Sequence, residues 1–249
     1  MGQGSVFAVV GIDTDVGKTI ATGLMARSLR QMGKTVITQK PVQTGCAGYS
    51  EDILTHRQIM GCDLLPEDEE GLTCSYVLPT PCSPHLAARL AGITIDPKRI
   101  CQATAELRRR YQVVLLEGAG GLFVPLAEGF TLLDYLKGEG FPLILVTSSR
   151  LGSINHSLCA LEALQRRDMV LAGLVYNRLE TSDWRIAEDS RQVIGRYLRT
   201  YGFSCPLVDL HPLADYKDGD DVAPFRIFFT PAEATTPLAP PANTPKEQG

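Results

Sequence analysis

One stretch of the chain, VVGIDTDVGKTIATGLMARSL from Val9 to Leu29, most constrains the fold. It starts as an apolar run of strand length, passes through a polar loop, and continues as a helix that opens with Gly17, Lys18 and Thr19. Such a loop points backbone N–H groups and a helix N-terminus at one small volume, which suits a chain of phosphates. The sequence therefore predicts a nucleoside triphosphate site between a buried strand and the next helix.

The last residues of this loop predict specific contacts. Gly17 lets the backbone approach a phosphate, Lys18 reaches the β- and γ-phosphates, and the Thr19 hydroxyl is placed to ligate Mg²⁺. The strict spacing GxxxxGK[ST] is missed by one residue, since Ile12 stands in the place of the first glycine and Gly11 precedes it. An ordinary strand-to-helix turn with a surface lysine is the alternative, but the flanking elements and the intact GKT favour the phosphate loop.

Apolar runs of strand length alternate with helix-patterned stretches along the chain. The expected strands are Val6 to Gly11, Val36 to Thr38, Val113 to Leu116, Leu143 to Val146 and Leu171 to Tyr176. The expected helices lie near 18–32, 52–60, 84–91, 97–110, 131–138, 153–167 and 183–201, with Gly33, Gly92 and Gly202 as terminators. Unbroken apolar runs separated by helices predict an α/β fold with a doubly wound, mostly parallel sheet of the P-loop NTPase type.

The domain organisation follows from composition. The hydrophobic content of 44% is ample for a full core, and no composition shift or internal repeat interrupts the alternation, so we expect one P-loop α/β domain over residues 1–229. From Thr230 onward the segment TPAEATTPLAPPANTPKEQG has many prolines and few large apolar residues. Such a segment cannot repay its ordering entropy, so we expect residues 230–249 to be a disordered tail.

Charge and cysteine content exclude several classes of protein. A formal net charge of -4 gives no basic face for nucleic acid. No apolar run approaches the roughly 20 residues of a membrane span, and the N-terminus lacks a signal-peptide layout, so we expect a cytoplasmic protein that binds no membrane. The seven cysteines form no CxxC-type pair. We therefore expect reduced, mostly buried thiols rather than metal ligands or a disulfide framework.

Two further charged residues follow expected strands. Lys40 comes directly after a strand, with Pro41 preventing helix continuation, although a solvated lysine in this place is an equally good interpretation. Glu117 follows the apolar run VVLL and precedes three glycines, which indicate close approach of a ligand or of backbone. At the rim of the sheet its carboxylate is placed to hold Mg²⁺ opposite Thr19, with a capping or surface glutamate as the alternative.

Six blocks taken together resemble the dethiobiotin synthetase family in order and rough spacing. They are GIDTDVGKT, KPVQTG, SED, PCSPH, EGAGGLFVPL and LGSINHSL, and the similarity covers residues 6 to about 180. Single blocks are shared with plasmid-partition ATPases and with amidotransferase-linked cobyrinate enzymes. The KPV, SPH and INH blocks in combination are more specific to dethiobiotin synthetase.

The resemblance implies an activity. The family makes the ureido ring of dethiobiotin from 7,8-diaminopelargonate, CO₂ and ATP with Mg²⁺. An amine captures CO₂ as a carbamate, a carbamate oxygen attacks the γ-phosphate, and the second amine displaces phosphate to close the ring. Lys18 and Lys40 suit these steps, because two cations neutralise the carbamate and the migrating phosphoryl group without acting as bases.

The resemblance also implies the site residues. The catalytic set is Lys18, Lys40 and Thr14. The nucleotide set is Asp15, Val16, Gly17, Lys18, Thr19, Glu117 and Asn177, of which Asn177 reads adenine. The Mg²⁺ set is Thr19, Asp52 and Glu117. The diamine set is Asp13, Thr14, Lys40, Thr44, Gly118, Gly121, Ser153 and Asn155. In the family the GSINH block takes the distant carboxylate of the substrate from across a dimer interface, so a homodimer with shared sites is implied.

Other positions are expected to be structural or depart from the family. His85 in the SPH block shapes a loop, and His156 is a helix-packing residue. Ile12 replaces a threonine of the family pattern, and VDLHPLAD stands where the family has Gly-x-Ile-Pro, so base selectivity is not implied there. Two rival functions fit the sequence less well. A switch-type partition ATPase commonly has an early second loop lysine or a membrane-targeting helix, and we find neither in the sequence. An amidotransferase synthetase needs a glutaminase region, for which we expect too little chain after residue 205.

Overall fold

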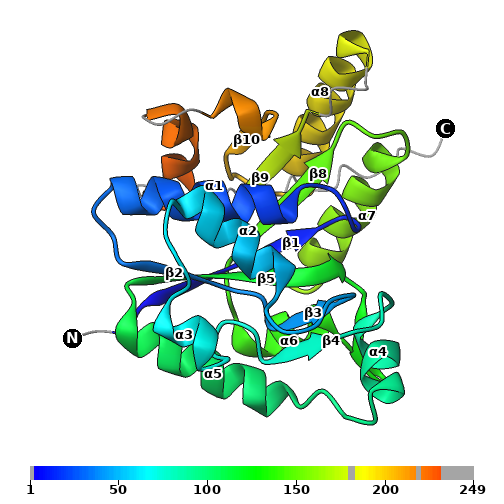
Figure 1. The fold of residues 1–249 in the computed structure, drawn as a ribbon. Coiled ribbons are helices and arrows are strands. Elements are labelled where there is room, and N and C mark those ends of the chain that lie inside the picture. The colour runs from blue at the N-terminus through cyan, green and yellow to red at the C-terminus, as the bar shows by residue number, and fades with distance from the viewer. Residues whose placement is uncertain (1–2, 179–182, 217–219, 231–249) are drawn as a thin grey trace, which may run out of the picture.

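The computed structural model describes residues 3–178, 183–216 and 220–230. Its centre is a six-stranded parallel sheet with the strand order β10-β9-β8-β1-β5-β2 (Figure 1). The strands are β1 (Ser5–Gly11), β2 (Val36–Gln39), β5 (Val113–Gly121), β8 (Leu143–Ser148), β9 (Leu171–Asn177) and β10 (Leu207–Leu210). The five expected strands are thus confirmed, and β10 is an edge strand that the sequence pattern did not predict.

Helices cover both faces of this sheet. They are α1 (Lys18–Gln31), α2 (Glu51–Met60), α3 (Pro66–Glu69), α4 (Pro84–Leu90), α5 (Pro97–Arg110), α6 (Leu132–Glu139), α7 (Ser153–Gln165), α8 (Trp184–Thr200), and the 3₁₀ helices η1 (Leu213–Asp215) and η2 (Asp220–Phe228). Apolar side chains of α1 and η2 form the core on one face, and those of α4 to α8 form the core on the other. Figure 1 shows α1 and α2 on one side and α5 and α6 on the other. The expected doubly wound α/β fold is confirmed.

Two small sheets lie outside the main one. Strand β3 (Val42–Thr44) pairs in parallel with β4 (Tyr76–Leu78), and β6 (Pro125–Ala127) pairs antiparallel with β7 (Phe130–Thr131). Gly33, Gly92 and Gly202 follow helices with φ of 74°, 68° and 82°, which confirms them as helix terminators. The expected tail falls almost entirely outside the described residues, because nothing after Thr230 is described. The boundary at residue 229 stays a prediction.

The strand order places three carboxyl ends side by side. Strand β5 lies between β1 and β2, so the loop after β1, the residue after β2 and the end of β5 share one edge of the sheet. Val9 pairs with Glu117, and Gln39 pairs with Leu116. Lys40 follows Gln39 directly, so this register brings it beside Glu117. Ligands of open parallel sheets bind at this kind of edge.

Three expectations need correction. Glu117 does not follow its strand but lies inside β5, because the glycines after it continue the pairing as far as Gly11 with Gly121. His156 does not pack inside the helix layer; it is exposed, since α7 turns the face of Ser153, Ser157 and Leu161 inward. All seven cysteines are free thiols, as expected, but they are not mostly buried, since only Cys46 is buried and Cys159 is exposed.

None of the described helices combines the length and the apolar character of a membrane span.

Candidate active site

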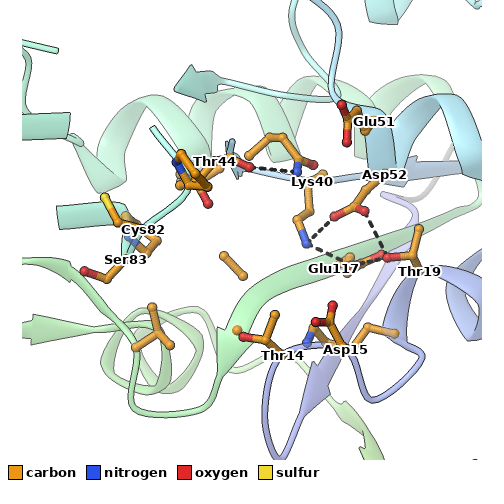
Figure 2. Close-up of a pocket in the computed structure, with 18 of the residues that line it drawn as sticks. Thr14, Asp15, Thr19, Lys40, Thr44, Glu51, Asp52, Cys82, Ser83 and Glu117 are labelled. Carbon is orange, nitrogen blue, oxygen red and sulfur yellow. Dashed lines mark hydrogen bonds and ion pairs between the residues drawn. The ribbon is translucent and has the colours of Figure 1, made fainter. Parts of the chain in front are cut away.

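A cavity of about 870 Å³ opens at the carboxyl ends of β1, β5 and β2 (Figure 2). Nine of the predicted site residues line it: Thr14, Asp15, Gly17, Lys18, Thr19, Lys40, Thr44, Asp52 and Glu117. They come from the loop before α1, from the start of α1 and α2, and from β2, β3 and β5. The structure therefore brings together residues that are separated by up to about a hundred positions in the chain. The cavity is large enough for a drug-sized ligand.

The loop before α1 has a backbone shaped for close approach. Asp15 has φ 55° and Gly17 has φ 98°, so both adopt left-handed conformations just before the helix N-terminus. A Cβ at position 17 would lie 2.5 Å from Nδ2 of Asn177, which leaves room there only for glycine. Successive N–H groups in such turns and at helix starts form concave anion sites. The local geometry thus fits a phosphate cradle.

Lys18 carries a charge that its nearest contact does not neutralise. The side chain is buried, and its Nζ donates a hydrogen bond to the carbonyl oxygen of Asp13 at 2.7 Å. Burial, together with the positive charge of Lys40, lowers the pKa of Lys18 to about 8. An anion bound beside this ammonium would stabilise its charged form, so the surroundings of Lys18 favour an anionic ligand.

Lys40 lies at the centre of a buried ion cluster. Its Nζ is 2.8 Å from Oε1 of Glu117 and 2.7 Å from Oδ2 of Asp52 (Figure 2). The Thr19 hydroxyl lies between the same two carboxylates, 3.0 Å from Oδ1 of Asp52 and 3.1 Å from Oε1 of Glu117. A single hydrophilic cluster therefore joins the start of α1, the start of α2, the end of β2 and β5.

Opposite charges decide the protonation of this cluster. Burial alone would raise the pKa of Glu117, but the Lys40 charge and the hydrogen bond of His56 hold that pKa well below its usual range. Burial likewise opposes the charge of Lys40, yet Glu117 and Asp52 raise the pKa of Lys40 above its ordinary value. Both groups are therefore charged at neutral pH.

The donor set around Thr19 suits a hard cation. One hydroxyl and two carboxylates offer only oxygen ligands, as Mg²⁺ prefers. Within the described part of the chain, no three His, Cys, Asp or Glu side chains are grouped so that they could hold a metal on their own. Mg²⁺ is commonly held by one or two carboxylates plus the phosphates of a substrate. The residues present fit that arrangement.

Helix α2 is set firmly in place behind the cluster. Ser50 caps it by accepting a hydrogen bond from the Ile53 N–H, so Asp52 falls in the first turn. Arg57 fixes the opposite end of the helix through two hydrogen bonds of 2.8 Å to Asp68 and one of 2.9 Å to Oγ1 of Thr38. These buried contacts hold the position of Asp52 relative to β2.

Sequence reasoning missed one residue of this region, His56. Its Nε2 lies 2.8 Å from Oε2 of Glu117, and its ring is fully buried. The signal was present in the sequence, since His56 follows Asp52 by four positions and therefore shares its face of α2. What the sequence could not show is that Glu117, far along the chain, meets this face.

Four predicted residues support the site without lining its main cavity, namely Asp13, Val16, Gly118 and Gly121. Val16 is buried beneath the loop. The Gly118 carbonyl accepts a hydrogen bond from Nζ of Lys40 at 3.2 Å, and a Cβ there would lie 2.5 Å from the Leu132 side chain. Gly121 and Asp13 line an adjoining groove of about 380 Å³ that shares Val124 with the main cavity. The carboxylate of Asp13 is held there by an ion pair of 2.6 Å with Arg150.

Three predicted residues lie away from the main cavity. Asn155 is exposed near the start of α7, while Ser153 is buried with its hydroxyl 2.9 Å from that of Ser148. Neither lines the cavity of its own chain, as a site shared between subunits would require. Asn177 at the end of β9 donates from Nδ2 to the Val16 carbonyl at 3.0 Å. It thus lies against the back of the phosphate loop.

Comparison with known sequences decides the family. A protein-family model described as an AAA domain matches residues 5–201. An ATP-dependent dethiobiotin synthetase of Pasteurella multocida is 52% identical over 196 residues, which cover 79% of this chain and 92% of that protein. One from Chlorobaculum tepidum is 49% identical over 210 residues, covering 84% and 88% of the two chains. The chain belongs to the ATP-dependent dethiobiotin synthetase family.

Solved structures agree on the fold of this dethiobiotin synthetase family member. The septum site-determining protein MinD of Pyrococcus horikoshii, complexed with Mg-ADP, aligns with a TM-score of 0.53 at 16% identity and covers 90% of this chain and 93% of its own. The pNOB8 ParA structure, bound to nonspecific DNA, gives 0.51 at 13% identity, covering 90% and 91%. At such identities the likeness concerns the fold alone. The sequence relatives therefore favour the synthetase over the partition-type ATPase.

Proposed function

We propose that this chain closes a ureido ring on 7,8-diaminopelargonate with CO₂ and ATP, giving dethiobiotin, ADP and phosphate. One observation carries the proposal beyond the family: two buried lysines, Lys18 and Lys40, line the same cavity. Lys18 belongs to the phosphate loop after β1, and Lys40 directly follows β2, with β5 between these two strands. A substrate anion and the γ-phosphate can meet between two such cations.

The reaction divides into three balanced steps. An amine of the substrate adds to CO₂ and loses a proton, which forms a carbamate. A carbamate oxygen then bonds to the γ-phosphorus as the bond to ADP breaks, giving a carbamic-phosphoric anhydride. The second amine finally attacks the carbonyl carbon, loses a proton and expels phosphate.

The residues of the cavity act mainly by electrostatics. Lys18 binds the β- and γ-phosphates, and Lys40 faces the carbamate and the transferring group, with the hydroxyls of Thr14 and Thr44 orienting the substrate. Stabilising charge that develops in the transition state is the main demand of phosphoryl transfer. Neither lysine needs to exchange a proton with the substrate.

Mg²⁺ would be held by Thr19, Asp52 and Glu117, completed by phosphate oxygens. When bound, Mg²⁺ supplies charge neutralisation at the β- and γ-phosphates. Lys40 forms ion pairs with both carboxylates, so a bound Mg²⁺ would share these two residues with its ammonium. Asn177 is proposed to contact adenine from behind the loop, and the enzyme is proposed to act in the cytoplasm.

The proposed activity is tested by diamine-dependent release of phosphate from ATP in bicarbonate, with the organic product followed by mass. Carbon-13 bicarbonate should give a ring product that is heavier by one mass unit. The control omits the diamine and should release little phosphate. Rapid phosphate release without diamine would indicate a plain ATPase, and a ring product without the label would show that its carbonyl does not come from bicarbonate.

The magnesium proposal makes a prediction for two carboxylates. Asp52→Asn and Glu117→Gln should each raise the Mg²⁺ concentration for half-maximal activity, by roughly tenfold, because a neutral amide oxygen replaces an anionic ligand. Titration of activity with Mg²⁺ at fixed ATP measures the change. Asp63→Asn, at an exposed carboxylate that follows α2 and does not line this cavity, is the matched control. Unchanged Mg²⁺ dependence in both variants would remove these residues from the metal site.

We further propose a homodimer in which Asn155 and Ser153 of one subunit complete the diamine site of the other. Its support is the exposure of Asn155 at the start of α7, where helix N–H groups are available to a carboxylate. Leu151, directly before α7, and Phe123, between β5 and β6, are also exposed apolar side chains. Covering them in a dimer interface would remove apolar surface from water.

Mixing two inactive variants tests the shared site. Lys18→Ala and Asn155→Ala homodimers should both be poorly active, the second through weak diamine binding. Half of randomly exchanged dimers are mixed, and each has one site with both residues intact, so roughly a quarter of the original activity should return. Differently tagged subunits, refolded together and separated, show whether exchange occurred. Verified mixed dimers that stay as inactive as their parents would show that Lys18 and Asn155 do not meet across subunits.

A further inference from the structure

His56 is a buried polar residue to which the reaction steps above assign no role. It lies on α2, one helical turn after Asp52, and its ring has no exposed surface. Nε2 is 2.8 Å from Oε2 of Glu117, whereas Nδ1 is buried with no hydrogen-bond partner. Packing alone does not explain this residue, because a buried polar side chain costs free energy and Nε2 points directly at a carboxylate oxygen.

The chemistry of Glu117 fixes the direction of this hydrogen bond. A carboxylate has only acceptors, so Nε2 of His56 must carry the hydrogen and donate it to Oε2. In the neutral ring this leaves Nδ1 as a bare acceptor, which agrees with its lack of a donor. The contact is therefore a hydrogen bond to charge, one of the stronger kinds in proteins.

The two oxygens of Glu117 have separate partners. Oε1 faces the cavity and accepts hydrogen bonds from Thr19 at 3.1 Å and Lys40 at 2.8 Å. Oε2 faces α2 and accepts only from His56 among the contacts that the structure gives. If the carboxylate rotated about its last bond, these assignments would be lost.

We propose that His56 is a positioning residue, which holds Oε2 of Glu117 so that Oε1 alone is presented to Lys40 and to a bound divalent cation. The inference rests on the proposed metal site, because Glu117 must be a ligand for its orientation to affect the metal. Partners that orient a ligand in this way commonly alter metal affinity by about 10 to 100 times when they are removed.

Helix α2 is suited to position Glu117 because the same helix carries Asp52, which faces the proposed metal site, and His56, which contacts Glu117. Asp52 reaches Lys40 and Thr19 directly, while His56 reaches the back of Glu117. The next residue, Arg57, ties the helix to Asp68 and Thr38 through buried hydrogen bonds. The fold therefore fixes the distance between the Asp52 carboxylate and the His56 imidazole.

The test measures Mn²⁺ affinity by electron paramagnetic resonance in the presence of ADP, without turnover. His56→Leu fills the space but removes the donor, while His56→Gln retains an amide N–H near the place of Nε2. Glu117→Gln reports whether Glu117 binds the metal at all. Ile59 lies on α2, like His56, and its buried side chain packs against Gly23 of α1. Ile59→Val trims this side chain and therefore controls for loosened packing.

His56→Leu is expected to weaken Mn²⁺ binding by about tenfold or more. His56→Gln should stay within about threefold of the unchanged protein, and Ile59→Val should not change Mn²⁺ affinity although it lowers the melting temperature. In turnover assays His56→Leu should lower kcat at limiting Mg²⁺ and leave KM for the diamine unchanged. Should His56→Leu fail to fold, His56→Asn replaces it, because its shorter amide does not reach Oε2.

Three results would overturn the inference. Wild-type Mn²⁺ affinity in His56→Leu, with weakened binding in Glu117→Gln, would leave the metal site standing and remove His56 from it. Equal losses in His56→Leu and His56→Gln would show that the donor is not what matters. Unchanged affinity in Glu117→Gln would contradict the metal site itself, and with it the role of His56.

Discussion

Replacing Lys18 by alanine is expected to abolish turnover while the protein stays folded. The buried ammonium donates to a backbone carbonyl and has the lowered pKa of a desolvated cation, so it is positioned to meet the charge of a transferring phosphoryl group. Removal of one such preorganised contact typically costs about 3 kcal/mol in the barrier, or roughly a hundredfold or more in rate. Diamine-dependent phosphate release measures the effect.

Thermal unfolding without ligand is the control for this variant. Burial and the charge of Lys40 lower the pKa of Lys18, which means that the fold disfavours its charged form, so its removal should leave the melting temperature unchanged or raise it. Retention of near-normal turnover in a folded Lys18→Ala protein would refute the assigned role. A loss of turnover accompanied by unfolding would equally contradict the prediction, because the lysine would then be a structural residue.

Replacing Lys40 by glutamine is expected to reduce turnover more than it weakens ATP binding. Nζ of Lys40 contacts the carboxylates of Asp52 and Glu117, and in the proposed mechanism it meets the carbamate and the γ-phosphate rather than the base or the α-phosphate. Kinetics and nucleotide binding must be measured separately, the second by titration with ADP. Equal losses of affinity and rate would mean that Lys40 is a general anchor for the nucleotide.

The same Lys40 variant should lower stability, unlike Lys18→Ala. Glu117 has no exposed surface, and removal of one partner of a buried ion pair commonly costs roughly 3 kcal/mol. Adding Glu117→Gln to Lys40→Gln should recover much of that loss, because no uncompensated carboxylate then remains at position 117. Denaturant unfolding of the two single variants and the double variant gives the coupling energy. Strictly additive losses would show that the pair is not coupled.

The central strands could be predicted from the sequence because they are buried on both faces. Every residue of β8 is buried, and the first four, Leu143 to Val146, form an apolar run that can be recognised without knowledge of the neighbouring strands. Strand β10 alternates between buried and half-exposed residues and follows Pro206, so LVDL shows no such run. The three-residue β3 and β4 are too short for any period to be visible.

The candidate site could be predicted only where local chemistry marked it. The loop from Asp13 to Thr19 has its own pattern, and the structure places it at the predicted edge of the sheet. Lys40 was ambiguous by itself, because its meaning comes from pairing β2 with β5, which sets it beside Glu117. His56 escaped notice for the same reason. The positions of Lys40 and His56 relative to Glu117 depend on contacts between segments far apart in the chain, which no local sequence pattern shows.

The proposed carbamate mechanism can be tested by following oxygen-18 from CO₂ into phosphate. In the proposed mechanism a carbamate oxygen, held by Lys40, attacks the γ-phosphate held by Lys18. If CO₂ labelled with oxygen-18 is mixed rapidly with enzyme, diamine and ATP, before the label exchanges with water, each phosphate formed should carry one labelled oxygen, and the ring should keep the other. Ring product formed together with unlabelled phosphate would contradict the account.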